Sequence, residues 1–290
     1  MVDQAALQSA VADYDPSLRI ASTERVSGGD IHAAFCMRLA DGDAIFVKAN
    51  TLDRSAVLRS EYESLIEFAK FPDLNYPRAL HFSRDNNHAY LLMSWHEMGS
   101  LDRHTAADLG YLLARQHSIE AAEFGWPQDN FIGWTPQCNS RLPSWAAFFR
   151  ERRLQPQLAL AGQRGLDVAL AQSCQLVCDE LDTLLAGAER RPALLHGDLW
   201  SGNVASEGGT RGILFDPAPY FGAPEADLAM TELFGRLPVG FYAAYESQRP
   251  RQPGYQRRAA VYNLYHALNH FNLFGSGYQA LIKTQLRQMK

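Results

Sequence analysis

The stretch Leu194–Val204 reads LLHGDLWSGNV, and shortly after it Ile213–Ala218 reads ILFDPA. In each stretch a short apolar run, which predicts a buried strand, leads directly into polar residues. Asp198 ends the first run, Asn203 follows five positions later, and Asp216 comes thirteen positions after Asn203. The pattern therefore predicts two carboxylates and one amide held together at the ends of two buried strands.

Phosphoryl transfer to a hydroxyl group explains such a set of side chains. One carboxylate must orient the hydroxyl and accept its proton, while an amide and a second carboxylate hold Mg²⁺ on the phosphates. The Asp-x4-Asn interval is similar to the catalytic loop of protein kinases. HGDxxxxN is similar to the loop of small-molecule kinases related to aminoglycoside phosphotransferases.

A site of this kind also needs a lysine on an upstream strand to grip the phosphates. Lys48 ends the apolar run in IFVKAN, where such a lysine is expected. In the helix predicted to follow, Glu61 is the candidate carboxylate that positions Lys48, and Glu63 is the alternative. Ser27-Gly28-Gly29 is similar to a loop over nucleotide phosphates, because glycine permits close backbone approach, although a plain hairpin turn explains it nearly as well.

The remaining pattern predicts an α+β chain with two unlike lobes. Apolar runs at 33–39 and 44–47 flank Asp41-Gly42, a hairpin signal, and a further strand is expected at 89–95. Helices are expected at 1–19, 55–70, 106–117, 142–153, 168–189 and 256–274. We predict a small antiparallel-sheet lobe with one main helix over residues 1–94 and a larger, mainly helical lobe over residues 95–290.

Composition narrows the class of protein. Hydrophobic residues make up 47% and charged residues 20% of 290 residues, as in an ordinary globular enzyme. A net charge of −5 gives no basic footprint for nucleic acid. No signal peptide or membrane-spanning segment is expected, and the four cysteines form no CxxC pair, so we expect a cytoplasmic protein.

Beyond these motifs the chain resembles the fructosamine kinase (ketosamine kinase) family over nearly its whole length. The segments that carry the resemblance are SGGDIHAAF with FVKAN, NFIGWTPQCN, SWAAFFRERRL, LLHGDLWSGNV, FDPAPYFGAPEADLAM and YNLYHALNHFNLFG. The resemblance implies a two-lobed protein-kinase-like fold. It also implies phosphorylation by ATP of the 3-hydroxyl of a sugar joined as a ketoamine to a small amine or a protein lysine. The phosphorylated adduct tends to fall apart, which implies a deglycation role.

The resemblance also implies roles for single residues. Asp198 would be the catalytic base, Asn203 and Asp216 would hold Mg²⁺, and Lys48 with Glu61 would serve the nucleotide. The candidate hinge to adenine consists of Met93, Ser94 and Trp95. Trp200 is a candidate platform for the sugar or amine, with core packing as the alternative. The chain departs from the family at Gly222-Ala223-Pro224-Glu225, where a His-Arg pair often precedes the glutamate, and this bears on substrate contacts.

Two other hypotheses stay open at the level of sequence. One is another small-molecule kinase, acting on an aminoglycoside, choline or a free sugar. The other is a catalytically inactive kinase-like binding module, although such modules usually lose the lysine, the aspartate or a metal ligand. His266 and His270 lie four apart on a predicted helix without an evident third ligand, so we expect core or pocket-wall histidines rather than a metal site. A monomer or weak dimer is expected.

Overall fold

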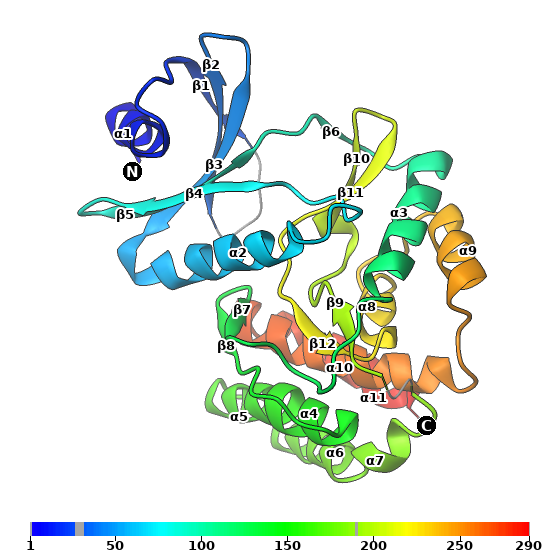
Figure 1. Ribbon diagram of the computed structural model, residues 1–290. Coiled ribbons are helices and arrows are strands. Elements are labelled where there is room, and N and C mark those ends of the chain that lie inside the picture. The colour runs from blue at the N-terminus through cyan, green and yellow to red at the C-terminus, as the bar shows by residue number, and fades with distance from the viewer. Residues whose placement is uncertain (1, 27–31, 189–190, 290) are drawn as a thin grey trace.

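The computed structural model describes residues 2–26, 32–188 and 191–289, and it has the two unlike lobes that the sequence predicts (Figure 1). The small lobe is a five-stranded antiparallel sheet in the order β1-β2-β3-β5-β4. Its strands are β1 (Ile20–Val26), β2 (Ala33–Leu39), β3 (Ala44–Thr51), β4 (Ala79–Arg84) and β5 (His88–Ser94). The expected hairpin through Asp41-Gly42 is confirmed, since β2 pairs with β3 and Gly42 has a φ of +98°.

Two helices cover the two faces of this sheet. α1 (Gln4–Tyr14) packs with Tyr90 and Leu92 on one face, and α2 (Ser55–Phe68) lies on the side of Leu91 and Met93. Successive residues of β5 thus point to opposite faces and are buried on both, which explains its uninterrupted apolar run. The side chain of Asp3 accepts a hydrogen bond from the backbone N–H of Ala6 and caps α1.

The large lobe is mainly helical, as predicted. Its helices are α3 (Arg103–Gln116), α4 (Trp145–Phe149), α5 (Gln155–Gln163), α6 (Val168–Asp179), α7 (Leu181–Leu184), α8 (Glu225–Met230), α9 (Val239–Gln248), α10 (Tyr255–Phe274) and α11 (Gln279–Gln288). Short strands form small sheets among them: β6 (Met98–Gly99), β7 (Asn130–Ile132), β8 (Thr135–Gln137), β9 (Ala193–Leu195), β10 (Val204–Glu207), β11 (Arg211–Leu214) and β12 (Tyr220–Gly222). 3₁₀ turns occur here at 201–203 and 276–278, and another at 52–54 precedes α2 in the small lobe.

Several predicted bounds are wrong. The helix expected at 142–153 begins at Trp145, because Ser144 caps it, and passes through a π-helical turn at Arg150–Leu154 into α5. The helix expected at 168–189 is two helices, α6 and α7. The helix expected at 1–19 ends at Tyr14.

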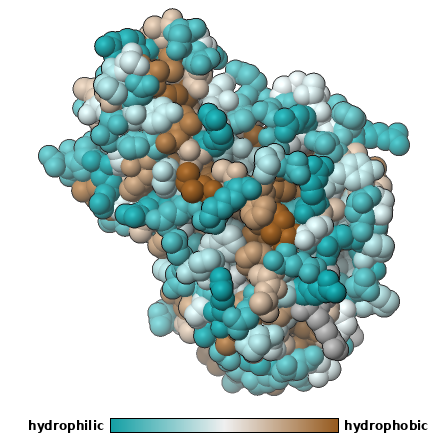
Figure 2. All heavy atoms as spheres, viewed as in Figure 1, coloured by the Kyte–Doolittle hydropathy of each residue, from teal (hydrophilic) through white to brown (hydrophobic). Residues whose placement is uncertain are grey.

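A single large hydrophobic cluster runs from the α2 side of the small sheet through the large lobe. α10 lies at its centre, with the side chains of most of its residues buried. The four cysteines are free thiols, and three of them are buried. On the face drawn in Figure 2, hydrophilic residues cover most of the surface, and hydrophobic residues gather along the small lobe and where the lobes meet. β5 ends at Ser94, while the division of the chain after residue 94 stays a prediction.

Candidate active site

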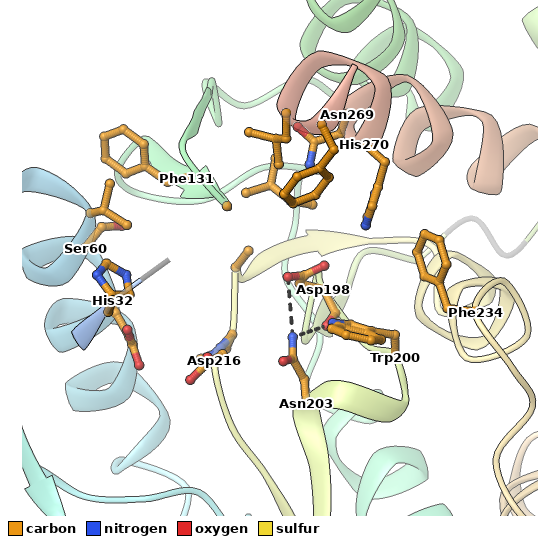
Figure 3. A pocket seen from close by; sticks show the side chains of 18 of the residues that line it. His32, Ser60, Phe131, Asp198, Trp200, Asn203, Asp216, Phe234, Asn269 and His270 are labelled. Carbon is orange, nitrogen blue, oxygen red and sulfur yellow. Dashed lines mark hydrogen bonds between the residues drawn. The ribbon is translucent and has the colours of Figure 1, made fainter. Parts of the chain in front are cut away.

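Two cavities open between the lobes and share one wall. The first, of about 640 Å³, lies under the small sheet and is lined by Met93, Ser94 and Trp95 of the predicted hinge. The second, of about 410 Å³, extends over the large lobe and is lined by Asp198 and by residues of α10 (Figure 3). The residues that line both cavities are Lys48, Glu61, Trp200, Asn203 and Asp216. Apart from the glycine loop, the structure thus brings the predicted site residues together around these two cavities. Gly28 and Gly29 lie outside the described residues.

Lys48 stands at the junction of the two cavities with two carboxylates. Its Nζ lies 2.7 Å from Glu61 Oε1 and also makes an ion pair with Asp216. Glu63 pairs instead with Arg59 on the outside of α2. Burial alone would lower the pKa of Lys48, but the charges of Asp216 and Glu61 outweigh it and raise that pKa, so the ammonium stays charged.

Asp198 lies at the floor of the second cavity, after the buried strand β9. Asn203 Nδ2 donates to the backbone carbonyl of Asp198 at 2.8 Å and approaches its Oδ2 at 3.4 Å. Burial, with a further contribution from the charge of Asp216, raises the pKa of Asp198 to about 7. A carboxyl with a pKa near neutrality is suited to accept a proton during turnover.

Asn203 and Asp216 both offer oxygen atoms at the junction of the two cavities. Because the Asn203 amide nitrogen is bonded to the carbonyl of Asp198, its Oδ1 is left as an acceptor. Asp216 has a left-handed backbone, with a φ of +55°, a strained conformation that is most often found at functional sites. Burial would raise the pKa of Asp216, but Lys48 lowers it below its ordinary value, so this carboxylate is ionised.

The donor set fits a magnesium ion held jointly by protein and nucleotide. Among residues 2–26, 32–188 and 191–289, no group of three or more histidine, cysteine, aspartate or glutamate side chains could hold a metal on its own. Mg²⁺ in phosphoryl-transfer sites is usually bound by one or two protein oxygens together with phosphates and waters. Asn203 Oδ1 and a carboxylate oxygen of Asp216 match that requirement.

One residue that fixes the loop before Asp198 was not predicted from the sequence. The carboxylate of Asp227, at the start of α8, accepts the backbone N–H of His196 at 2.6 Å and that of Gly197 at 2.9 Å, and His117 Nε2 lies 3.1 Å away. Gly197 has a φ of +83°, and a Cβ there would lie 2.0 Å from the carbonyl oxygen of Ala218. Asp227 therefore holds a turn that only glycine can make.

Aromatic rings form the wall of the second cavity beyond Asp198. Trp200 packs edge-on against Phe234 with ring centroids 5.9 Å apart, and Phe234 lies 4.4 Å from His270 (Figure 3). The indole of Trp200 folds over Gly202, where a Cβ would lie 2.3 Å from the ring. Trp200 is partly exposed and lines both cavities. Its role as a substrate platform stays a prediction.

The comparisons agree with this geometry. The profile of the fructosamine kinase family matches residues 2–290. A probable ketoamine kinase of Synechocystis sp. is 42% identical over 272 residues, covering 93% of this chain and 90% of that protein. A chloroplastic protein-ribulosamine 3-kinase of Oryza sativa subsp. japonica is 34% identical, with 94% of this chain and 81% of that protein covered.

Solved structures show the same fold. A structure assigned as a fructosamine-3-kinase from Thermobifida fusca superposes with a TM-score of 0.87 at 30% identity, covering 100% of this chain and 99% of that one. An aminoglycoside phosphotransferase, in complex with ADP and hygromycin B, superposes with a TM-score of 0.63 at 16% identity over 98% of each chain. The predicted protein-kinase-like fold is confirmed, and the chain belongs to the fructosamine kinase family.

Proposed function

We propose that this enzyme transfers the γ-phosphoryl group of ATP, with Mg²⁺, to the sugar 3-hydroxyl of a ketoamine such as a fructosamine or ribulosamine. The observation that carries the proposal is the arrangement of Lys48, Asn203, Asp216 and Asp198 at the junction of two cavities. The names of the Synechocystis and rice relatives support the acceptor class. The complex of the structurally similar aminoglycoside phosphotransferase with ADP supports adenine nucleotide as the donor.

The cavity under the small sheet is the proposed nucleotide side. Met93, Ser94 and Trp95 line it at the end of β5, where adenine would meet backbone groups. Lys48, held by Glu61, would contact the α- or β-phosphate. Bound Mg²⁺ would neutralise charge on the phosphates, with Asn203 and Asp216 as its protein ligands.

The cavity with Asp198 is the proposed acceptor side. As the bond forms between the acceptor oxygen and the γ-phosphorus, the bond from that phosphorus to the bridging oxygen of ADP breaks. The hydroxyl proton moves to a carboxylate oxygen of Asp198, whose pKa of about 7 favours its uptake. The sugar or its amine would pack on Trp200, because this residue is partly exposed and lines the cavity.

The test compares phosphate transfer from ATP to fructosyl-lysine, ribulosyl-lysine and kanamycin under identical conditions. We expect formation of ADP and a sugar 3-phosphate with one or both ketoamines, and none with kanamycin. Transfer to kanamycin alone would favour an antibiotic kinase, and nucleotide binding without transfer to any acceptor would favour an inactive binding module. Which ketoamine is preferred, and whether the lysine is free or in a protein, are outcomes of the same assay extended to glycated proteins.

No helix within the described residues is both long and apolar enough to cross a membrane. A cytoplasmic location and a monomeric or weakly dimeric state stay predictions.

A further inference from the structure

His32 lies just before β2, and its imidazole lines the cavity that contains Asp198 (Figure 3). The sequence analysis gave this residue no role. In Figure 3 the ring faces the cavity from the small-lobe side, opposite Asp198, with Asp216 between them. It lies outside the cavity that the predicted hinge lines.

A chain of two hydrogen bonds fixes which ring nitrogen carries the proton. The backbone N–H of Thr51 donates to Asn50 Oδ1 at 2.9 Å, which sets the orientation of the Asn50 amide. Asn50 Nδ2 then lies 2.8 Å from His32 Nδ1. Because an amide NH₂ group can only donate, Nδ1 of His32 must accept, and the ring proton is on Nε2.

In the protein without nucleotide, the surroundings of His32 favour the neutral imidazole. Burial is the main cause that lowers the pKa of His32 to about 4, the charge of Lys48 adds to it, and the charge of Asp216 opposes it. His32 therefore presents one N–H group, without a charge, to the cavity. None of the hydrogen bonds found among the described residues uses its Nε2 atom.

We propose that His32 belongs to the phosphoryl-transfer site and that its Nε2–H donates a hydrogen bond to an oxygen of the γ-phosphoryl group during transfer. The proposal rests on the proposed function in one respect, that the phosphates lie at the junction marked by Lys48 and Asp216. The γ-phosphoryl group leaves the nucleotide side and arrives on the acceptor side, which is the side that His32 faces. Donors aimed at charge that shifts during the reaction stabilise the transition state more than the ground state.

A purely structural role is the competing explanation, because the bond between His32 and Asn50 also supports the end of β3. Two substitutions separate these roles. In His32→Asn the side-chain amide can replace Nδ1 and keep a partner for Asn50, but it does not reach the position of Nε2. In His32→Gln the amide nitrogen can reach the position of Nε2, while the hydrogen bond between residue 32 and Asn50 is lost.

The experiment measures the affinity of each variant for Mg-ADP alone and for Mg-ADP with aluminium fluoride, a mimic of the transferred phosphoryl group. It needs no ketoamine, so it succeeds or fails independently of the proposed acceptor. We expect aluminium fluoride to tighten Mg-ADP binding in the wild type and in His32→Gln, and this gain to fall by about 10- to 100-fold in His32→Asn. Affinity for Mg-ADP alone should stay within a few-fold in both variants.

Turnover with the best acceptor provides a second measurement. We expect His32→Asn to lower kcat by about 10- to 100-fold with little change in the KM for ATP, and His32→Gln to keep most of the turnover. The proposal is overturned if His32→Asn keeps the wild-type gain with aluminium fluoride, if both variants lose it equally, or if the wild type shows no gain. A wild type that binds the mimic but phosphorylates no ketoamine would contradict only the proposed acceptor.

Discussion

Asp198→Asn should make the protein less active and, at neutral to alkaline pH, more stable. The structure raises the pKa of this carboxyl from the ordinary 3.8 to about 7, through burial and the neighbouring charge of Asp216. The charged form is therefore less stable in the folded protein than in the unfolded chain, and asparagine keeps the shape without the charge. Active sites commonly lower stability in this way.

The size of the gain follows from the pKa difference. One pKa unit corresponds to about 1.4 kcal/mol. The difference between 3.8 and about 7 therefore corresponds to a destabilisation of the charged form by about 4 kcal/mol in the folded protein. Asp198 is partly exposed, so solvent screens the effect, and we expect a gain in the free energy of unfolding of about 1–2 kcal/mol at pH 8. For a protein of this size that corresponds to about 2–6 °C in Tm.

The sign of the pH dependence is fixed by the raised pKa. Below 3.8 the carboxyl is protonated in both states and costs nothing; the penalty grows as pH rises and is complete above about 7. The difference in Tm between Asp198→Asn and the wild type, measured by calorimetry without nucleotide, should be largest at pH 8 and shrink as the pH falls toward 4. Turnover at pH 8 should fall by about 10²- to 10⁴-fold, with ATP affinity within a few-fold.

Asp227→Asn is the matched control with the opposite sign. Burial would raise the pKa of Asp227, but hydrogen bonds from His117 and the loop backbone lower it, so its charge stabilises the fold at neutral pH. This variant should lose stability at pH 8. An Asp198→Asn variant that is no more stable than the wild type at pH 8 would refute the raised pKa. One that keeps more than about a tenth of the turnover would show that Asp198 is not the base.

Three further predictions concern the same lobes. Asp216→Asn should weaken binding of Mg-ATP, measured by calorimetry, as well as turnover, because it removes a proposed metal ligand; unchanged Mg-ATP affinity would contradict that role. The kcat/KM for the acceptor should fall on acidification, since Asp198 must lose its proton to act, with Mg²⁺ bound by Asp216 moving the midpoint below the value of about 7 in the nucleotide-free protein; a rate that does not fall on acidification would count against it. Arg258 is buried, and its Nε and Nη2 atoms each lie 2.6 Å from a carboxylate oxygen of Glu225. Glu225→Gln leaves this guanidinium without its charged partner and should destabilise the fold by about 3 kcal/mol in thermal or urea unfolding; an unchanged Tm would refute this.

Local signals allowed much of the small lobe to be predicted. The Asp41-Gly42 turn lies between two apolar runs, and the structure has the two strands β2 and β3 there, paired as a hairpin. It also has the expected ion pair between Lys48 and Glu61. β1 and β4 were not predicted, since β1 has no fully buried residue and β4 has only partly buried or exposed ones. Strands with so few buried positions carry no clear period of two.

The parts of the site that were missed depend on contacts between distant segments. Asp227 binds backbone groups thirty residues earlier in the chain, and nothing in its local sequence distinguishes it from a surface aspartate. His32 likewise depends on Asn50 for its tautomer and on the packing of the lobes for its position in the cavity. In both cases the residue type was visible, but its partner was set by tertiary structure.

The segment NFIGWTPQCN, one of those that carry the resemblance to the family, contributes three buried amides, Asn130, Gln137 and Asn139, rather than reactive groups. Asn130 Nδ2 donates to the carbonyl of Pro219 at 2.8 Å, and Gln137 and Asn139 both donate to Asn130 Oδ1. These bonds hold the chain three residues after Asp216, while the tip of the β7–β8 hairpin lines the cavity that contains Asp198. Replacing one amide leaves the others buried without partners, at a cost of about 1–3 kcal/mol each, so the set can change only together. The proposed phosphoryl transfer needs only the few polar side chains at the junction, whereas the wall of the proposed acceptor cavity needs a complete buried network.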